Sequence, residues 1–181
     1  MRALRCIAVF LLASLCIHAA EAHNSKAWRE RLAARTVKLW VEGQALDNIV
    51  LNSRGELNVT WAERGLYRYL EQDRDVDEWL VNSLHYYFSN SREVRDKMKG
   101  RDVFVLNCRA VKNWHFSPTN FVVGDYQITS DDILTRKEFW NGTMSPGDEN
   151  TVAVAAPSLK PGQKIEFRYG DASAAFEAPR R

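Results

Sequence analysis

The chain has 181 residues, of which 45% are hydrophobic, 11% aromatic and 27% charged. That length suits one globular domain or two small ones, and the aromatic content excludes a disordered chain. A net charge of +2 gives no reason to expect a protein whose whole surface binds nucleic acid.

The first 22 residues have the three parts of a secretory signal peptide. Two arginines make the start positive, residues 6–17 form an apolar run, and Ala20 and Ala22 have the A-x-A spacing that a signal peptidase accepts. As a helix the apolar run would cover only about 18 Å, which is too short to cross a bilayer. We therefore expect a signal peptide over 1–22 and an exported mature chain over 23–181 without a membrane span.

Removal of this segment leaves Cys108 as the only cysteine, so the mature chain cannot form an internal disulfide. A eukaryotic secreted module of this size usually has paired cysteines, and a bacterial periplasmic or secreted protein fits better. The alternative is a lipoprotein in which Cys16 is lipidated. Leu15 disfavours it, because a lipidation motif needs a small residue at that position.

The mature chain opens with three predicted strands. Residues 36–42 alternate apolar and polar side chains, which is the period of a half-buried strand. Residues 48–51 and 57–61 form two more such runs, separated by the turn-forming sequence of residues 52–55. This pattern predicts a hairpin between the second and third strands.

Residues 61–100 change to helical periodicity and predict a helical insertion. Thr60 and Glu63 have the spacing of a capping box at its start, and Gly100 supplies a left-handed stop at its end. Its middle part has a wide apolar stripe, which we expect to dock on the rest of the domain. The stripe consists of Val76, Trp79, Leu80, Leu84, Tyr87 and Phe88.

From residue 101 onward the chain again predicts strands. Residues 103–106 form a continuous apolar run, which is typical of a strand buried on both faces. Shorter strands separated by Gly and Pro turns follow at residues 120–123, 126–128, 151–156, 164–169 and 173–178.

These elements predict an α+β fold: an immunoglobulin-like antiparallel β-sandwich with a helical insertion of two to three helices. The strands of residues 36–61 would join those of residues 101–178, because three opening strands make a poor core by themselves. The alternative is a small α/β domain followed by a separate sandwich, with the break near Gly100.

The sequence contains no recognisable catalytic motif. Cys108 continues the apolar face of Phe104 and Leu106, so we expect it to be a buried structural thiol and not a nucleophile. Phosphate-binding glycine motifs, the G-x-S-x-G elbow and zinc-type ligand spacings are absent, and we expect no metal and no cofactor. Acidic residues in the loops 125–132 and 148–150 leave calcium binding open.

Surface recognition is the function that remains. Trp114, Phe116, Tyr126, Phe139 and Trp140 crowd the loop-rich half of the sandwich, beside Arg136 and Lys137. Aromatic side chains with polar flanks suit a protein partner or a sugar, and we expect three of these five to be core residues.

We select Trp114, Tyr126, Arg136 and Trp140 as the candidate binding residues. The expected function is a non-enzymatic interaction or envelope-accessory protein that binds another envelope or extracellular protein, or a glycan. A carbohydrate-binding module and a hydrolase with dispersed acidic residues are the alternatives.

Overall fold

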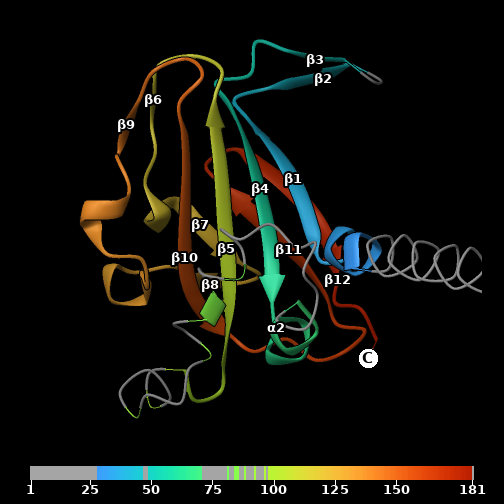
Figure 1. Ribbon diagram of the computed structural model, residues 1–181. Coiled ribbons are helices and arrows are strands. Elements are labelled where there is room, and N and C mark those ends of the chain that lie inside the picture. The colour runs from blue at the N-terminus through green and yellow to red at the C-terminus, as the bar shows by residue number, and fades with distance from the viewer. Residues whose placement is uncertain are drawn as a thin grey trace, which may run out of the picture.

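The computed structural model describes residues 28–46, 49–70 and 98–180, together with six single residues between positions 81 and 96. The predicted signal peptide lies outside the described residues. The described part is an α+β fold built mainly from antiparallel sheets (Figure 1). None of its helices is long and apolar enough to cross a membrane.

The first sheet has four antiparallel strands in the order β1-β4-β5-β10. The strands are β1 (Thr36–Val41), β4 (Gly55–Ala62), β5 (Arg101–Ala110) and β10 (Glu149–Pro157). β4 and β5 pair from Ala62↔Val103 to Gly55↔Ala110. The strands before and after the predicted helical insertion therefore share one sheet.

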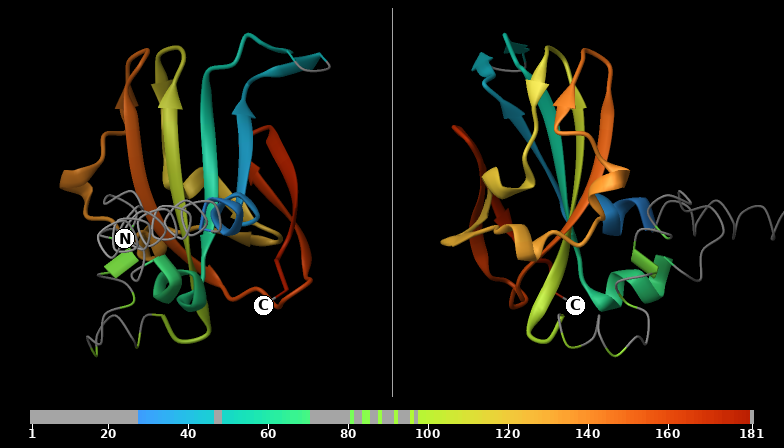
Figure 2. Two further views of the ribbon diagram at one scale, coloured as in Figure 1. Left: turned by 45° about the vertical axis from the view of Figure 1, so that its right-hand side comes forward. Right: turned by 90° about the vertical axis from the view of Figure 1, so that its left-hand side faces the viewer.

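The second sheet faces the first and also has four antiparallel strands, in the order β12-β11-β7-β8 (Figure 2). The strands are β12 (Ala172–Glu177), β11 (Lys164–Tyr169), β7 (Phe121–Val123) and β8 (Tyr126–Gln127). Two-stranded sheets add β2 (Gln44–Leu46) with β3 (Ile49–Leu51), and β6 (Trp114–His115) with β9 (Thr143–Met144). Three 3-10 turns are η1 (Pro118–Asn120), η2 (Ser130–Asp132) and η3 (Lys137–Phe139).

The predicted hairpin across residues 52–55 is wrong in its pairing. β3 pairs with β2, and β4 pairs instead with β1, in a register that sets Val41 opposite Gly55. The turn residues support the long pair, because the Ser53 hydroxyl bonds the carbonyl oxygens of both Val41 and Gly55. Six register positions between β1 and β4 outweigh the three that β3 could offer.

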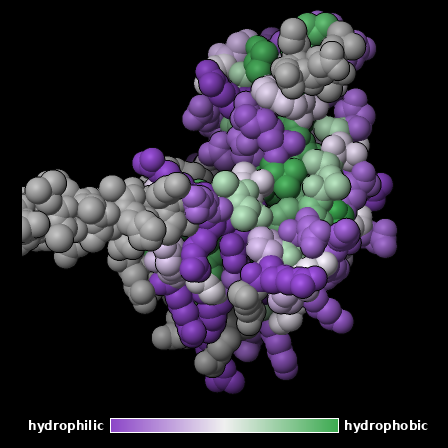
Figure 3. Space-filling view, turned by 90° about the vertical axis from the view of Figure 1, so that its right-hand side faces the viewer, coloured by the Kyte–Doolittle hydropathy of each residue, from purple (hydrophilic) through white to green (hydrophobic). Residues whose placement is uncertain are grey.

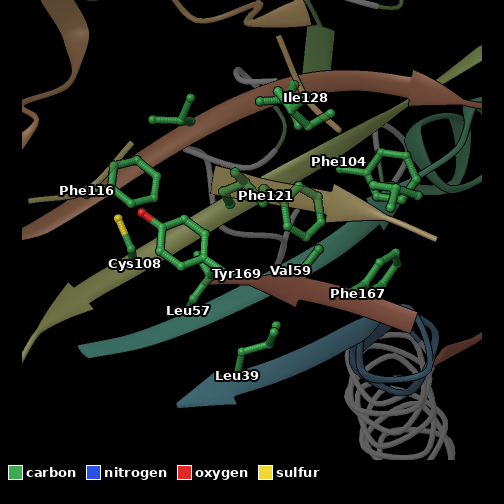
Figure 4. Packing of buried hydrophobic residues seen from close by; sticks show 14 of the residues in the cluster. Leu39, Leu57, Val59, Phe104, Cys108, Phe116, Phe121, Ile128, Phe167 and Tyr169 are labelled. Carbon is green, nitrogen blue, oxygen red and sulfur yellow. The ribbon is translucent and has the colours of Figure 1, made fainter. Parts of the chain in front are cut away.

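The main hydrophobic core fills the space between the two sheets (Figure 4). On β5, Phe104, Leu106 and Cys108 point into this core, whereas Val103 and Val105 belong to a second cluster on the opposite face. The continuous apolar run predicted for a strand buried on both faces is therefore confirmed. At the centre of the main core, the ring of Phe104 meets that of Phe167 edge-on, with centroids 5.7 Å apart.

Helical residues cover the outer face of the first sheet. Residues 28–33 are helical, and α2 (Arg64–Leu70) packs beside them with Leu66, Tyr67 and Leu70 buried. Leu84 is fully buried in the same cluster. Of the predicted apolar stripe, Val76, Trp79, Leu80 and Tyr87 lie outside the described residues; Leu84 and Phe88 pack on this face as expected.

The capping box predicted from Thr60 and Glu63 does not form. β4 continues to Ala62, so Thr60 belongs to the sheet and its hydroxyl lies 2.9 Å from that of Thr36. Glu63 alone serves the start of α2, where its carboxylate accepts the N–H of Gly65 at 3.0 Å. The sheet ladder wins because it satisfies more backbone groups than a cap at Thr60 would.

Candidate functional site

The structure divides the four predicted binding residues between two places. Trp114 and Trp140 both contact Phe116, with ring centroids 5.4 and 6.0 Å apart, respectively. Tyr126 instead contacts Arg101, at the other end of β5. A ten-residue strand spans about 30 Å, so these places cannot form one contact surface for a small ligand.

Residues 136–142, which we call the aromatic loop, project from the side of the molecule away from β1 (Figure 1). Phe139 lies in η3 at the tip and is 73% exposed, the most exposed large hydrophobic side chain among the described residues. The flanking Arg136 and Lys137 are also exposed and form no ion pair with a described residue. An aromatic side chain beside unpaired cations is typical of a protein-binding hot spot.

The C-terminal half of the aromatic loop is firmly attached to the sandwich. Asn141 and Asn150 exchange two hydrogen bonds: the Asn141 N–H donates to the Asn150 side chain at 3.2 Å, and the Asn150 amide donates to the Asn141 carbonyl at 2.6 Å. The carbonyl of Gly142 accepts the N–H of Phe116 at 2.8 Å. The loop therefore presents Phe139 from a fixed base, which lowers the entropy lost on binding.

Trp140 is half-buried under the loop and does not offer an open ring face. The ammonium of Lys137 lies 3.3 Å from its ring centroid, a close cation–π contact. Phe116 contacts the same ring at nearly a right angle, with 85° between the planes. Trp140 therefore supports the shape of the loop, while Phe139 and Arg136 are its accessible members.

Trp114 is only 3% exposed and belongs to the main core. A Cβ placed on Gly55 would lie 2.6 Å from the Trp114 ring, which shows how closely the backbone of β4 approaches the indole. Tyr169 meets the same ring edge-on at 5.7 Å. Trp114 is therefore a core residue, and it supports the aromatic loop indirectly through its contact with Phe116.

Tyr126 takes part in a buried polar network that sequence reasoning missed. Its hydroxyl donates to the Asp132 carboxylate at 2.9 Å, and Arg101 donates to the other carboxylate oxygen at 2.5 Å. Thr129 adds two further bonds to Asp132, from its N–H at 2.8 Å and its hydroxyl at 2.9 Å. The T-x-x-D spacing of Thr129 and Asp132 is the one local signal that could have indicated this cluster.

The network shifts two pKa values in opposite directions. Burial by itself would raise the pKa of Asp132, but the bonds from Thr129, Arg101 and Tyr126 outweigh it and hold that pKa below its ordinary value. Burial, and then hydrogen bonding to Asp132, raise the pKa of the Tyr126 phenol. Asp132 and Tyr126 are hydrogen-bonded to each other, so the network has a structural role: it joins β5, β8 and η2.

Tyr126 also lines a groove of about 770 Å³ between the β7–β8 turn and the β10–β11 connection. Asp125 and Glu166 both line it, and they are the only candidates there for the paired acids of a hydrolase. Both are exposed, and Glu166 pairs with Arg168 at 3.9 Å. Neither lies in the enclosed apolar setting that is typical of a carboxyl acting as a general acid.

Cys108 is fully buried, as predicted. Its Sγ lies 3.9 Å from the Met144 sulfur and 3.5 Å from the carbonyl oxygen of Asn150, and burial raises its pKa to about 12. Within the described ranges, no three His, Cys, Asp or Glu side chains come together as metal ligands.

Comparisons with protein-family models, with curated proteins and with solved structures found no match to this chain.

Proposed function

We propose that this chain is an exported, non-enzymatic interaction protein, and that its aromatic loop binds another protein of the cell envelope or the extracellular space. The observation that carries the proposal is Phe139, a large apolar side chain held 73% exposed on a fixed base. A large apolar side chain at a loop tip adds little to stability there, and beside the exposed Arg136 it has the composition of a binding hot spot.

Export and fold support this proposal. The positive start, short apolar run and A-x-A site of residues 1–22 favour cleavage before His23, in a periplasmic or secreted protein whose mature domain covers residues 23–181. Two facing antiparallel sheets support an immunoglobulin-like sandwich in the loose sense, with two to three helices added on one face. Such sandwiches commonly use loops at their ends and sides for recognition.

The chemistry of the aromatic loop favours a protein partner that offers an apolar pocket with an acidic rim. Phe139 would enter the pocket, while Arg136 would face a rim carboxylate. A glycan is disfavoured, because stacking on a sugar needs an open aromatic face and Lys137 covers that of Trp140.

A photo-crosslinking experiment tests the binding surface. A photoreactive phenylalanine analogue is placed at Phe139 or, as a control, at Val111, a half-exposed apolar residue on a different turn. We expect a discrete crosslinked product in intact cells from position 139 and none from position 111. Equal products from both positions, or none from position 139, would refute the proposed surface.

Export has its own readout in the same cells. Mass spectrometry of the purified protein should give a chain that starts at or near His23 and has no acyl group. A chain that retains residues 1–22, or an acylated Cys16, would contradict this part of the proposal.

A further inference from the structure

β12 is an edge strand whose outer side has no partner in the described structure. The N–H of Ala178 donates to the carbonyl of Gln163, and this bond shows which residues of β12 direct their backbone groups toward β11. Alternate residues of an antiparallel strand bond to opposite sides. Ala172, Ala174 and Phe176 therefore bond to β11, and Ser173, Ala175 and Glu177 direct their backbone groups outward.

The other three edges of the two large sheets are protected against pairing. β1 has Lys38 at an outward-bonding position, and β8 has only two residues. Residues 133–135 cover β10, where Leu134 and Thr135 both donate to the carbonyl of Ala153. Charged side chains, short length and coverage are the usual means by which proteins prevent edge-to-edge association.

Along β12 the only such protection is Glu177 at its end, and this carboxylate pairs with Lys164 at 3.6 Å. Residues 172–176 are Ala-Ser-Ala-Ala-Phe, with no charge and no proline. The surrounding surface is also apolar, because Val37, Ala172 and Ala174 are only partly buried. Figure 3, which faces this side of the molecule, shows a hydrophobic strip between hydrophilic regions.

We infer that β12 pairs antiparallel with β12 of a second copy of this chain, so that the second sheets of two molecules form one continuous sheet. Centred on Ala175, this register sets Ala175 opposite Ala175 of the second copy and Ser173 opposite Glu177. Small side chains face each other at the centre, and no like charges are opposed. Asp171 of each copy also comes near Arg180 of the other, so the charges at both ends are complementary.

This arrangement stops at two copies. The interface is isologous and uses the unprotected edge of both molecules, and the protected edges leave no site for a third. A six-residue strand pair buries less area than a standard protein interface, so we expect a weak dimer, populated at micromolar or higher concentration.

The experiment compares Ala175→Pro with Ala175→Val in the full chain, purified as the cell processes it. Proline removes an outward N–H without touching the bonds to β11, whereas valine keeps that N–H and favours strands. In the two-fold pair, Ala175→Pro removes two hydrogen bonds. Sedimentation velocity should show a dimer dissociation constant about 30-fold higher for Ala175→Pro, equivalent to about 2 kcal/mol at 1.4 kcal/mol per tenfold, and one within about threefold of wild type for Ala175→Val.

Amide hydrogen exchange of the wild-type chain gives a second measurement, which does not depend on whether a variant folds. Exchange at Ser173 and Ala175 should slow as the protein concentration rises, while exchange at Val111 should not change. A wild-type chain that stays monomeric at all concentrations would overturn the inference. So would a dimer that Ala175→Pro leaves intact, or concentration-dependent protection elsewhere than at β12.

Discussion

The Asp132 network allows the sharpest test of the energetics of this fold. Asp132 is 3% exposed, and its carboxylate accepts four hydrogen bonds, from Thr129, Tyr126 and Arg101. In Asp132→Asn the shape is kept, but one carboxylate oxygen becomes an NH₂ group. In one orientation of the amide, this NH₂ group faces the Arg101 guanidinium. In the other orientation, it faces the donors of Thr129 and Tyr126. In both cases two hydrogen-bond donors face each other.

Breaking one partner of a buried ion pair costs about 3–5 kcal/mol. The Arg101 side chain is 25% exposed, so water compensates part of this loss. We expect Asp132→Asn to lower the free energy of unfolding by about 2–3 kcal/mol, measured by urea denaturation at pH 7. The matched control is Asp131→Asn, an exposed neighbour in the same 3-10 turn, which should change it by less than about 0.5 kcal/mol.

The pH dependence adds an independent check. The folded-state pKa of Asp132 is lowered, so its contribution to stability is present above the unfolded pKa of about 3.9 and is lost as the pH falls through the folded value. The difference between wild type and Asp132→Asn should therefore be constant from pH 5 to 7 and shrink below pH 4. A variant as stable as wild type at pH 7, or a difference that grows on acidification, would refute the reasoning.

Three further predictions concern the cores. Burial raises the pKa of the Cys108 thiol to about 12, so a thiol reagent at pH 8 should label the native chain far more slowly than the urea-unfolded chain. Because the side chain is small, Cys108→Ala should lower the free energy of unfolding by only about 1 kcal/mol. Gly55→Ala would place a methyl group 2.6 Å from the Trp114 ring, and the melting temperature should fall by the equivalent of about 1–3 kcal/mol; an unchanged melt would contradict the close packing. Leu84→Ala should cost about 2–5 kcal/mol if Leu84 docks on the first sheet, and an unshifted melt would mean that it does not.

Local periodicity predicted those elements whose burial is regular along the chain. The alternation of residues 36–42 and the apolar run of residues 103–106 were enough to identify β1 and the centre of β5. Pairing was harder to predict, because it depends on which strands compete. β3 is close to β4 in sequence, yet β1 offers a longer register and takes the place beside it.

The sequence predicted which aromatic residues belong to the candidate site, but not which of them are exposed. Five aromatic residues were expected in the loop-rich half, yet sequence alone could not separate the buried Trp114 from the exposed Phe139. Burial there depends on which side chains meet across β6 and β9, two-residue strands with no periodicity of their own. The Asp132 network was equally hidden, because Arg101 and Asp132 meet only after the two sheets have packed.

The aromatic loop and β12 lie on opposite sides of the molecule, and this separation gives them compatible roles. The loop adjoins β10, the far edge of the first sheet, whereas β12 lies beside β1 at the other edge (Figure 1). Pairing through β12 would leave both loops open and directed away from the dimer axis. Two weak contacts joined in one rigid body bind a clustered partner more tightly than either contact alone, because the second contact becomes intramolecular. A single small loop such as residues 136–142 buries too little area for tight binding, and a two-fold dimer compensates for this without a larger binding surface.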